Sequence, residues 1–531
     1  MTVELLLAAG VILVCLLASK FSAKLGVPTL LVFIFLGMVF GSDGVFKIQF
    51  DNYSVAEQVC SIALIFIMFY GGFGTNWQKA KTVAVKAVML STVGVLLTAA
   101  ITGVFCHFVL GFGLLESFLI GAVISSTDAA SVFSILRSKR LNLKYNTASL
   151  LEVESGSNDP CSYMLTVIVL SLMNGEASGT HIIYMIFAQI VYGAAVGVVM
   201  ALICHFILTK VKFSNDGFES ILVFSMALVS YALSSVIGGN GYLSTYITGL
   251  ILGNKSFKSK KKLVNFFDGI TGLMQILIFF LLGLLAFPSQ LPQIVLPALA
   301  IALFLTFIAR PISVFAILTP FKCPLKQQLL VSWSGLRGAA SIVFAIMAMV
   351  SPAYIKNDVF HVVFFIVLFS ISLQGTLIPF ISNKLNMIDN NSDVMKTFND
   401  YADEVPVQFL KLKIGNSHPW CDKALKDIDL LPNVLVALII RNGAQIVPKG
   451  DTVIMKNDNV IVSGPSLDKE FEGCLTEIRI DADNKWLGKS LSDIKFGPDK
   501  LVILIKRNEK VVIPTGSTVV REDDVLIMNQ A

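Results

Sequence analysis

Charged residues are scarce in this sequence. Only 15% of the 531 residues are Asp, Glu, Lys or Arg, whereas a soluble domain contains roughly 25%. Hydrophobic residues make up 55% of the chain, and the mean hydropathy is +0.76. They occur in long runs such as "MQILIFFLLGLLAF" (274–287), and a helix needs about 20 such residues to cross a bilayer. This composition excludes an ordinary soluble domain and predicts an integral membrane protein.

Signatures of several other protein classes are missing too. The eight cysteines are isolated and no pair has metal-ligand spacing, so we interpret them as reduced packing residues. The sequence has no G-x-G-x-x-G, nucleophile elbow or phosphate-binding loop, so an enzyme is not expected. No filter of the TVGYG type is present, which argues against a channel. The first apolar block lacks a basic n-region and a cleavage site, so we expect a retained span.

Apolar blocks separated by glycine, proline, asparagine or charged breaks predict thirteen membrane spans. They cover residues 3–20, 27–41, 55–74, 82–109, 114–136, 146–173, 180–208, 217–237, 241–253, 263–286, 292–318, 327–350 and 358–382. Alternate loops hold 19 basic residues, and the intervening loops hold only Lys47 and Lys356. By the positive-inside rule, we expect the N-terminus outside the cell membrane and the C-terminal tail in the cytoplasm.

Four ionisable residues stand out inside predicted spans. Asp128 lies in "VISSTDAASVF", Asp159 near the middle of its span, and Arg337 in "SWSGLRGAAS". A charge at that depth is costly, and such residues usually face the bundle interior and mark an ion path. For either aspartate, the alternative is a structural ion pair that ties helices together. Arginine keeps its proton at working pH, so we expect Arg337 to be a fixed counter-charge. Arg310, in "FIARPISVF", lies toward the cytoplasmic end of its span beside Pro311, and we expect it to be structural, with a role in gating as the alternative.

The stretch "LLEVESGSNDP" (150–160) places three carboxylates in one span. Glu154 and Asp159 are five residues apart, so they face different sides of a helix. We expect Glu154 to form a structural ion pair with Arg337 while Asp159 faces the ion path. Glu152 lies almost on the face of Asp159 and could be an acid at the cytoplasmic mouth of that path. A solvated glutamate at the helix start is the alternative.

Small and polar residues interrupt two spans, as "SSTDAAS" (125–131) and "SGLRGAAS" (334–341). They predict helix breaks whose freed backbone groups line a polar cavity. By the loop assignment the two spans run in opposite directions, one in each half, as expected of an inverted repeat with a site at the membrane midplane. The oxygen ligands for an alkali cation or a proton would come from Thr127, Asp128, Asn158 and Asp159.

A buried carboxylate can bind a proton or a metal cation, because desolvation favours its neutral form and a nearby cation favours its charged form. Competition of this kind at Asp159, combined with alternating access, predicts obligatory exchange of a cation for protons. Since the neighbouring Asn158 is neutral, the simplest balance is one proton for each monovalent cation. We therefore expect electroneutral exchange.

These residues resemble the monovalent cation/proton antiporter family, in its NhaP-type branch, which is similar to sodium/proton exchangers. The motifs are "STDAASV" (126–132), "ESGSNDP" (154–160) and "GLRGA" (335–339), with weaker matches at 239–254 and 373–379. The resemblance implies an all-α polytopic membrane protein with thirteen transmembrane helices in two inverted six-helix repeats. It also implies interrupted crossing helices, an elevator-like motion and a homodimer.

For the site, the resemblance implies that Asp159 is alternately protonated and cation-bound, and that Asn158 marks the electroneutral branch. It implies that Glu154 and Arg337 form a structural pair. The motifs do not fix the cation, because sodium, potassium and mixed selectivities occur in the family. The residues that match the family's unwound crossing are Thr127 and Asp128.

Beyond about residue 389, short β-branched runs with turn residues predict a soluble α+β region. This tail holds 18 Lys and Arg against 22 Asp and Glu, so it is slightly acidic whereas the membrane region is basic. It also repeats at an offset of 66 residues, which indicates a duplicated module. The recurring pairs include Trp420 and Trp486, Lys423 and Lys489, Arg441 and Arg507, and Asp458 and Asp524.

Each copy resembles the TrkA-C domain, the C-terminal lobe of RCK regulators of potassium conductance and transport. We divide the chain into an antiporter domain (1–388), a linker (389–403) and two TrkA-C-like copies (404–465 and 466–531). The resemblance implies dimerisation and binding of a small regulator such as a nucleotide. NAD is not expected, because the sequence has no G-x-G-x-x-G. The alternative is a tail that serves only assembly.

Together these observations predict an electroneutral potassium/proton antiporter of the cell membrane, which exchanges cytoplasmic K⁺ for external H⁺ without a cofactor and contributes to pH homeostasis. Potassium is preferred because TrkA-C lobes usually accompany potassium handling. A sodium/proton or mixed antiporter is the nearest alternative. A tail-gated cation channel and a membrane sensor that transports nothing are alternatives from other classes.

Overall fold

The computed structural model divides into two compact units, Met1–Val394 and Met395–Ala531. The predicted linker, 389–403, lies outside the described residues from position 390 onward. The structure describes residues 2–25, 28–128, 131–132, 135–136, 141, 143–175, 178–211, 213, 215, 217–255, 257, 260–353, 355–389, 407–415, 418–430, 434–441, 444–465, 475–482, 484–494, 496, 500–507, 510–512 and 514–530.

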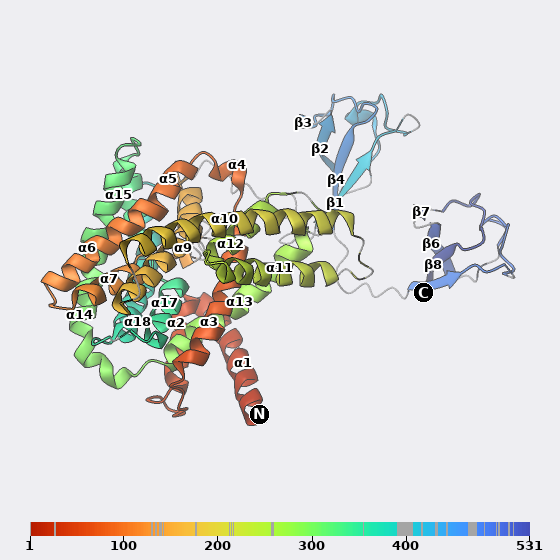
Figure 1. The fold of residues 1–531 in the computed structure, drawn as a ribbon. Coiled ribbons are helices and arrows are strands. Elements are labelled where there is room, and N and C mark those ends of the chain that lie inside the picture. The colour runs from red at the N-terminus through yellow and green to blue at the C-terminus, as the bar shows by residue number, and fades with distance from the viewer. Residues whose placement is uncertain are drawn as a thin grey trace. The chain divides into compact units, whose positions relative to one another are not determined.

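The first unit is helical (Figure 1). Its α-helices are α1 (Thr2–Leu25), α2 (Thr29–Phe40), α3 (Tyr53–Gly74), α4 (Trp77–Ala80), α5 (Ala84–Met89), α6 (Val95–Phe108), α7 (Leu114–Val123), α9 (Thr147–Met173), α10 (Gly179–Lys210), α11 (Gly217–Val236), α12 (Gly241–Gly253), α13 (Lys260–Leu284), α14 (Leu291–Phe304), α15 (Arg310–Leu318), α16 (Leu325–Trp333), α17 (Ala339–Val350), α18 (Val359–Phe369) and α19 (Thr376–Lys384). A short 3₁₀ segment, η2 (Pro288–Gln290), precedes α14.

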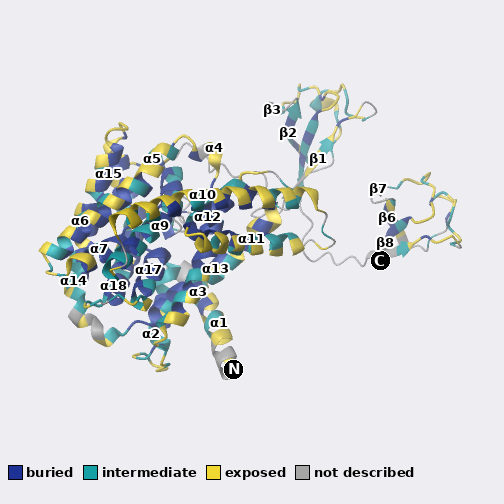
Figure 2. Ribbon diagram, viewed as in Figure 1, coloured by how far each residue is buried: buried dark blue, intermediate teal, exposed yellow. Residues whose placement is uncertain are grey.

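Among the described residues, 7 helices are long and apolar enough to cross a membrane. They are Tyr53–Gly74, Ala84–Phe108, Gly179–Lys210, Gly217–Val236, Lys260–Leu284, Ile294–Leu318 and Val359–Lys384. Many residues of α10 and α11 are exposed (Figure 2), and several of them have large apolar side chains, as expected of surfaces that face lipid. The interior of the unit is closely packed, with Phe344, Phe360 and Phe364 fully buried.

The two helix interruptions predicted from the sequence are confirmed. Helix α7 ends at Val123, and residues 125–128 lie outside any helix. Helix α16 ends at Trp333 and α17 begins at Ala339, so the intervening residues form the second interruption. Small and polar residues at both places leave backbone groups that must find partners elsewhere in the unit.

Three of the apolar helices contain a π-helical turn. These turns are η1 (Leu90–Gly94) between α5 and α6, η3 (Leu305–Ala309) between α14 and α15, and η4 (Ser370–Gly375) between α18 and α19. Such turns inside α-helices occur frequently at functional sites. Each one changes the rotation of the helix segment that follows it, and so changes which side chains face the bundle.

Glycines allow several helices to approach closely. A Cβ at Gly37 of α2 would lie 2.8 Å from the Cα atom of Gly283 on α13, and a Cβ at Gly283 would lie 2.9 Å from Gly37. Helix α12 contacts α3 in the same manner, because a Cβ at Gly72 would lie 2.9 Å from the backbone nitrogen of Leu250. Small residues at such contacts are the usual means of tight helix packing in membranes.

The second unit contains two antiparallel four-stranded sheets. The first orders β1 (Val407–Lys413), β4 (Asn459–Pro465), β2 (Leu435–Arg441) and β3 (Ala444–Ile446). The second has the same order, with β5 (Leu475–Arg479), β8 (Val525–Gln530), β6 (Lys500–Arg507) and β7 (Lys510–Val512). The predicted duplication of the tail is therefore confirmed in three dimensions.

The same buried ion pair stabilises each copy of the tail module. Arg441 donates from Nε to Asp458 at 2.9 Å, and Arg507 donates from Nε to Asp524 at 2.7 Å. In both copies the arginine Nη2 also donates to a backbone carbonyl 12 residues further on. Both aspartate side chains are fully buried, so each needs these donors.

Candidate functional site

The two helix interruptions meet inside the first unit. The backbone N–H of Asp128 donates to the carbonyl oxygen of Leu336 at 2.7 Å. This bond joins two segments that lie more than 200 residues apart in the sequence. Because each segment lacks its own helical partners there, the crossing satisfies backbone groups that lipid could not.

Arg337 occupies the second interruption and is 1% exposed. Its Nη1 donates to the carbonyl oxygens of Ser125 and Ser126, at 3.0 and 2.5 Å. These carbonyls follow the C-terminal end of α7, where the helix dipole concentrates negative partial charge. The guanidinium therefore caps the broken helix, as a fixed counter-charge that remains protonated.

Asp128 occupies the first interruption and accepts bonds from the next turn of its own segment. Its Oδ1 accepts from the Ser131 backbone N–H at 3.2 Å, and its Oδ2 accepts from the Ser131 hydroxyl at 2.5 Å. This geometry matches an N-cap, where a carboxylate satisfies the first N–H groups of a helix. The carboxylate also lies against Gly338, where an added Cβ would be 2.6 Å from the Asp128 Cγ. A role for Asp128 in ion binding remains a prediction.

One face of α9 is tied to the first interruption. Asn158 donates from Nδ2 to the Thr127 hydroxyl at 2.5 Å, and Ser155 donates to the Thr127 carbonyl at 2.7 Å. One turn further along, Ser162 donates to the Ala122 carbonyl at 2.6 Å. Residues 155, 158 and 162 follow the spacing of one helix face. Asn158 and Thr127 are among the residues predicted from the sequence, whereas Ser155 and Ser162 are not, although their spacing from Asn158 places them on the same helix face.

Asp159 follows Asn158 in α9, but it is not one of the residues that form these hydrogen bonds. Among the described residues, neither its Oδ1 nor the Oδ1 of Asn158 has a hydrogen-bond partner, and both atoms are buried. The Ser126 hydroxyl lies within hydrogen-bonding reach of Asp159, and Asp128 is close enough to interact electrostatically with Asp159. Buried polar atoms are nearly always paired, so these two oxygens stand out, and binding of a proton or a cation to them remains a prediction.

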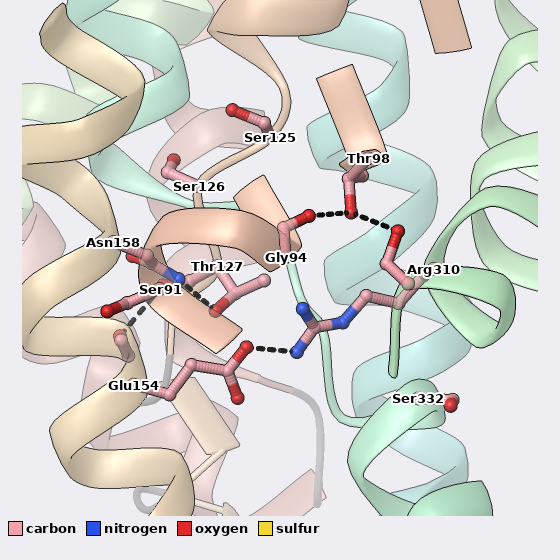
Figure 3. A network of polar contacts seen from close by, with 12 residues as sticks. Ser91, Gly94, Thr98, Ser125, Ser126, Thr127, Glu154, Asn158, Arg310 and Ser332 are labelled. Carbon is pink, nitrogen blue, oxygen red and sulfur yellow. Dashed lines mark hydrogen bonds and ion pairs between the residues drawn. The ribbon is translucent and has the colours of Figure 1, made fainter. Parts of the chain in front are cut away.

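The structure corrects the predicted pairing of Glu154 with Arg337. Arg310 of α15 donates from Nη2 to Glu154 Oε1 at 2.5 Å (Figure 3), and the side chains are 3% and 1% exposed. The Arg310 side chain reaches α9 across Gly335, where an added Cβ would lie 2.8 Å from its Nε. Sequence spacing could not choose between two buried arginines, and Arg337 is already bonded to the Ser125 and Ser126 carbonyls. The sequence signal for this partner is Arg310 itself, the second arginine within a predicted span.

A helical membrane unit with a polar site at two crossing helix breaks is typical of secondary transporters. A family model described as "Sodium/hydrogen exchanger, transmembrane" matches residues 10–384. A model of the TrkA-C domain matches residues 410–468 and 475–528. The chain belongs to the sodium/hydrogen exchanger family and carries two TrkA-C domains, as the sequence motifs predicted.

Named relatives extend over most of the chain. It is 34% identical over 462 residues to the K(+)/H(+) antiporter NhaP of Alkalimonas amylolytica, covering 86% of this chain and 80% of that protein. It is 34% identical over 501 residues to the K(+)/H(+) antiporter NhaP2 of Shewanella baltica, covering 93% and 86%. A protein described as probable Na(+)/H(+) antiporter 2 of Methanocaldococcus jannaschii is 28% identical over 358 residues, covering 65% and 83%.

A solved structure shares the fold of the helical unit. The sodium proton antiporter MjNhaP1 from Methanocaldococcus jannaschii at pH 8 superimposes with a TM-score of 0.63 at 25% sequence identity. The match covers 72% of this chain and 99% of that structure. The chain is thus a multi-pass membrane protein with an antiporter fold.

Proposed function

We propose that this chain is an electroneutral potassium/proton antiporter that exchanges cytoplasmic K⁺ for external H⁺. Two relatives at 34% identity over most of the chain are named K(+)/H(+) antiporters. The two TrkA-C domains favour the same cation, because such lobes usually accompany potassium handling. No enzymatic activity is proposed, since the family is one of transporters.

Sodium is the second candidate cation. The family is described as sodium/hydrogen exchangers, and the superimposable structure is that of a sodium proton antiporter. The hydroxyl, amide and carboxylate oxygens at the crossing suit either alkali cation. The overall exchange mechanism would be the same, and only the cation would differ.

The observation that carries the proposal is the pair of buried, unpaired oxygens on Asp159 and Asn158. We propose that Asp159 binds the proton and the cation alternately, with Asn158, Thr127 and Asp128 completing the ion-binding residues. Since a carboxylate holds one or the other, release of a proton on one side requires uptake of a cation there. With Asn158 neutral, the carboxylate balances one proton against one monovalent cation.

The finer architecture is also a proposal. We propose thirteen transmembrane helices in two inverted six-helix repeats, with elevator-like motion, a homodimer, an external N-terminus and a cytoplasmic tail. Two series of elements support the repeat, since each contains a π-turn helix (η1, η3), an interrupted helix (after α7, after α16) and a long helix (α9, α18 to α19). The helices that contain η1 and η3 contact each other through Thr98 and Ser313, whose oxygens lie 3.0 Å apart. Each of these side chains donates to the carbonyl that ends its π turn.

For the tail we propose regulation of transport from the cytoplasm. The proposed parts are an antiporter domain at 1–388, a linker at 389–403 and two modules at 404–465 and 466–531. TrkA-C membership supports a small regulator, with a nucleotide as the first class to test. A tail that serves only assembly would leave transport unchanged by any nucleotide.

The test uses the purified chain in proteoliposomes with an internal pH dye. We expect added K⁺ to collapse an imposed pH gradient in the wild type and not in Asp159→Asn, with no response to an imposed membrane potential. A response to Na⁺ alone would replace the proposed cation and keep the mechanism. An Asp159→Asn variant that matches the wild type would refute Asp159 as the carrier and favour a channel or a sensor.

A further inference from the structure

A tyrosine of α12 packs against the helix that carries Asp159. A Cβ at Gly156 of α9 would lie 2.8 Å from Cζ and 2.9 Å from the hydroxyl oxygen of Tyr246. Tyr246 is 4% exposed. Only a glycine at position 156 therefore leaves room for this ring and its hydroxyl group at the surface of α9.

The Tyr246 ring packs against one particular face of α9. Residues 152, 156 and 159 have the i, i+4, i+7 spacing of one helix face. Tyr246 thus lies over the face that carries Glu152 one turn before it and Asp159 one turn after it. The charges of both carboxylates act on Tyr246.

The Tyr246 hydroxyl is also unpaired. It is buried and has no hydrogen-bond partner in the part of the chain that the structure describes, like the Oδ1 atoms of Asp159 and Asn158. The Thr75 hydroxyl lies nearby and donates its own proton to the Gly71 carbonyl at 2.8 Å, so it has no proton to donate to Tyr246. Buried hydroxyl groups of tyrosine usually have a partner, so the unpaired oxygens of Tyr246 and Asp159 over one face of α9 point to a shared ligand.

The backbone supplies a third oxygen. Pro160 lies inside α9 and has no N–H, so it cannot donate to the carbonyl of Gly156 four residues earlier. That carbonyl belongs to the residue over which Tyr246 packs. Neutral hydroxyl, amide and carbonyl oxygens around one carboxylate are ligands suited to a hard monovalent cation rather than to an anion.

We propose that the Tyr246 hydroxyl is a ligand of the transported cation, at a position on α9 between Glu152 and Asp159. This inference rests on the proposed exchange function and adds a residue outside the motifs that identified the site. A phenol oxygen replaces a water of hydration without adding charge, which keeps the exchange electroneutral. Helix α12 packs mainly on α3, α10 and α11, so the hydroxyl would contact the cation only while α9 has its present position relative to α12.

The test measures proton release when KCl is added to the weakly buffered, detergent-purified chain, with a pH dye as readout. Tyr246→Phe removes only the hydroxyl, and we expect the half-saturating K⁺ concentration to rise about fivefold, the loss of one ordinary polar contact. The maximal proton release should stay the same. Tyr242→Phe is the matched control, because Tyr242 is one turn away on α12 and packs instead on Tyr163 and Tyr231, with ring centroids 5.1 and 5.0 Å apart.

An unchanged half-saturation in Tyr246→Phe would overturn the inference while leaving the exchange function intact. If neither KCl nor NaCl releases protons from the wild type, the exchange function fails and this inference fails with it. Should only NaCl act, the same comparison is made with Na⁺. Gly156→Ala gives a second measurement if Tyr246→Phe does not fold, since its Cβ displaces the hydroxyl. We expect it to raise the half-saturating concentration as well, and an unchanged value would again overturn the inference.

Discussion

Arg310 donates from Nη2 to Glu154 Oε1 at 2.5 Å, and both side chains are almost fully buried. Removing one member of a buried pair leaves the other charge uncompensated, which costs about 3–5 kcal/mol. We expect Arg310→Met and Glu154→Gln each to lower the apparent melting temperature in detergent markedly. The double variant should melt closer to the wild type than either single variant.

The same comparison with Arg337 is the control for that pairing. Arg337→Met combined with Glu154→Gln should show a smaller coupling than the pair with Arg310, because no direct bond joins Arg337 to Glu154 among the contacts of the described residues. A larger coupling for Arg337 would restore the pairing that the sequence suggested.

Arg337 has a different expected defect. Arg337→Gln loses the charge that caps the Ser125 and Ser126 carbonyls, and bonds of a charged donor are worth about 1.5–3 kcal/mol. We expect exchange to fall strongly, because the α7 break lies next to Thr127 and Asp159. Arg337→Lys should retain part of the activity in the proteoliposome assay. Full activity of Arg337→Gln would rule out a need for charge at this position.

The tail should lose stability in acid. The hydrogen bond from Arg441 lowers the pKa of Asp458, with burial opposing it. In Asp524, burial raises the pKa, but the bonds from Arg507 and Arg521 outweigh it and the net pKa is lowered. A carboxyl with a lowered folded-state pKa contributes stability above its unfolded pKa, about 3.9, and loses it as the pH falls through the folded value.

We therefore expect the tail to remain folded at neutral pH and to unfold below roughly pH 4. The measurement is the fluorescence of Trp420 and Trp486 in the full chain, with the membrane-unit tryptophans Trp77 and Trp333 replaced by Phe. Arg441→Met should move the transition of the first module to higher pH and leave the second module unchanged. Equal shifts in both modules would contradict independent ion pairs.

Close packing of α2 on α13 gives a prediction about stability alone. Gly283→Ala places a Cβ 2.9 Å from the Gly37 Cα atom, and such overpacking costs about 1–3 kcal/mol. The matched control is Gly272→Ala on the same helix, where an added Cβ meets nothing within 4 Å. Thermal melting in detergent should separate the two variants, and equal melting temperatures would show that α2 and α13 can move apart freely.

Local features of the sequence predicted much of what the structure contains. Runs of apolar residues gave the helical unit, because the cost of unpaired backbone in lipid leaves few alternatives. Small polar clusters at 125–131 and 334–341 predicted the helix breaks for the same reason. The constant offset of 66 residues predicted two copies of one module, which fold into sheets of identical strand order.

What the sequence could not determine were the partners of buried side chains. Two arginines, Arg310 and Arg337, were both available to Glu154. Which of them pairs with Glu154 depends on how the helices are rotated after the π turns, and no local sequence pattern predicts those turns. Ser155 and Ser162 looked like ordinary small residues until α9 was packed against α7.

Tyr246 is another residue whose contacts the sequence could not determine. Its sequence neighbourhood identifies a membrane helix, but nothing there relates it to Gly156, 90 residues earlier. The chain by itself determined its class, its helix breaks and its carboxylates, since these follow from local composition and the membrane. Only the tertiary structure decided which buried charges form pairs and which side chains of α9 contact the helix interruption, because those contacts depend on how distant helices pack.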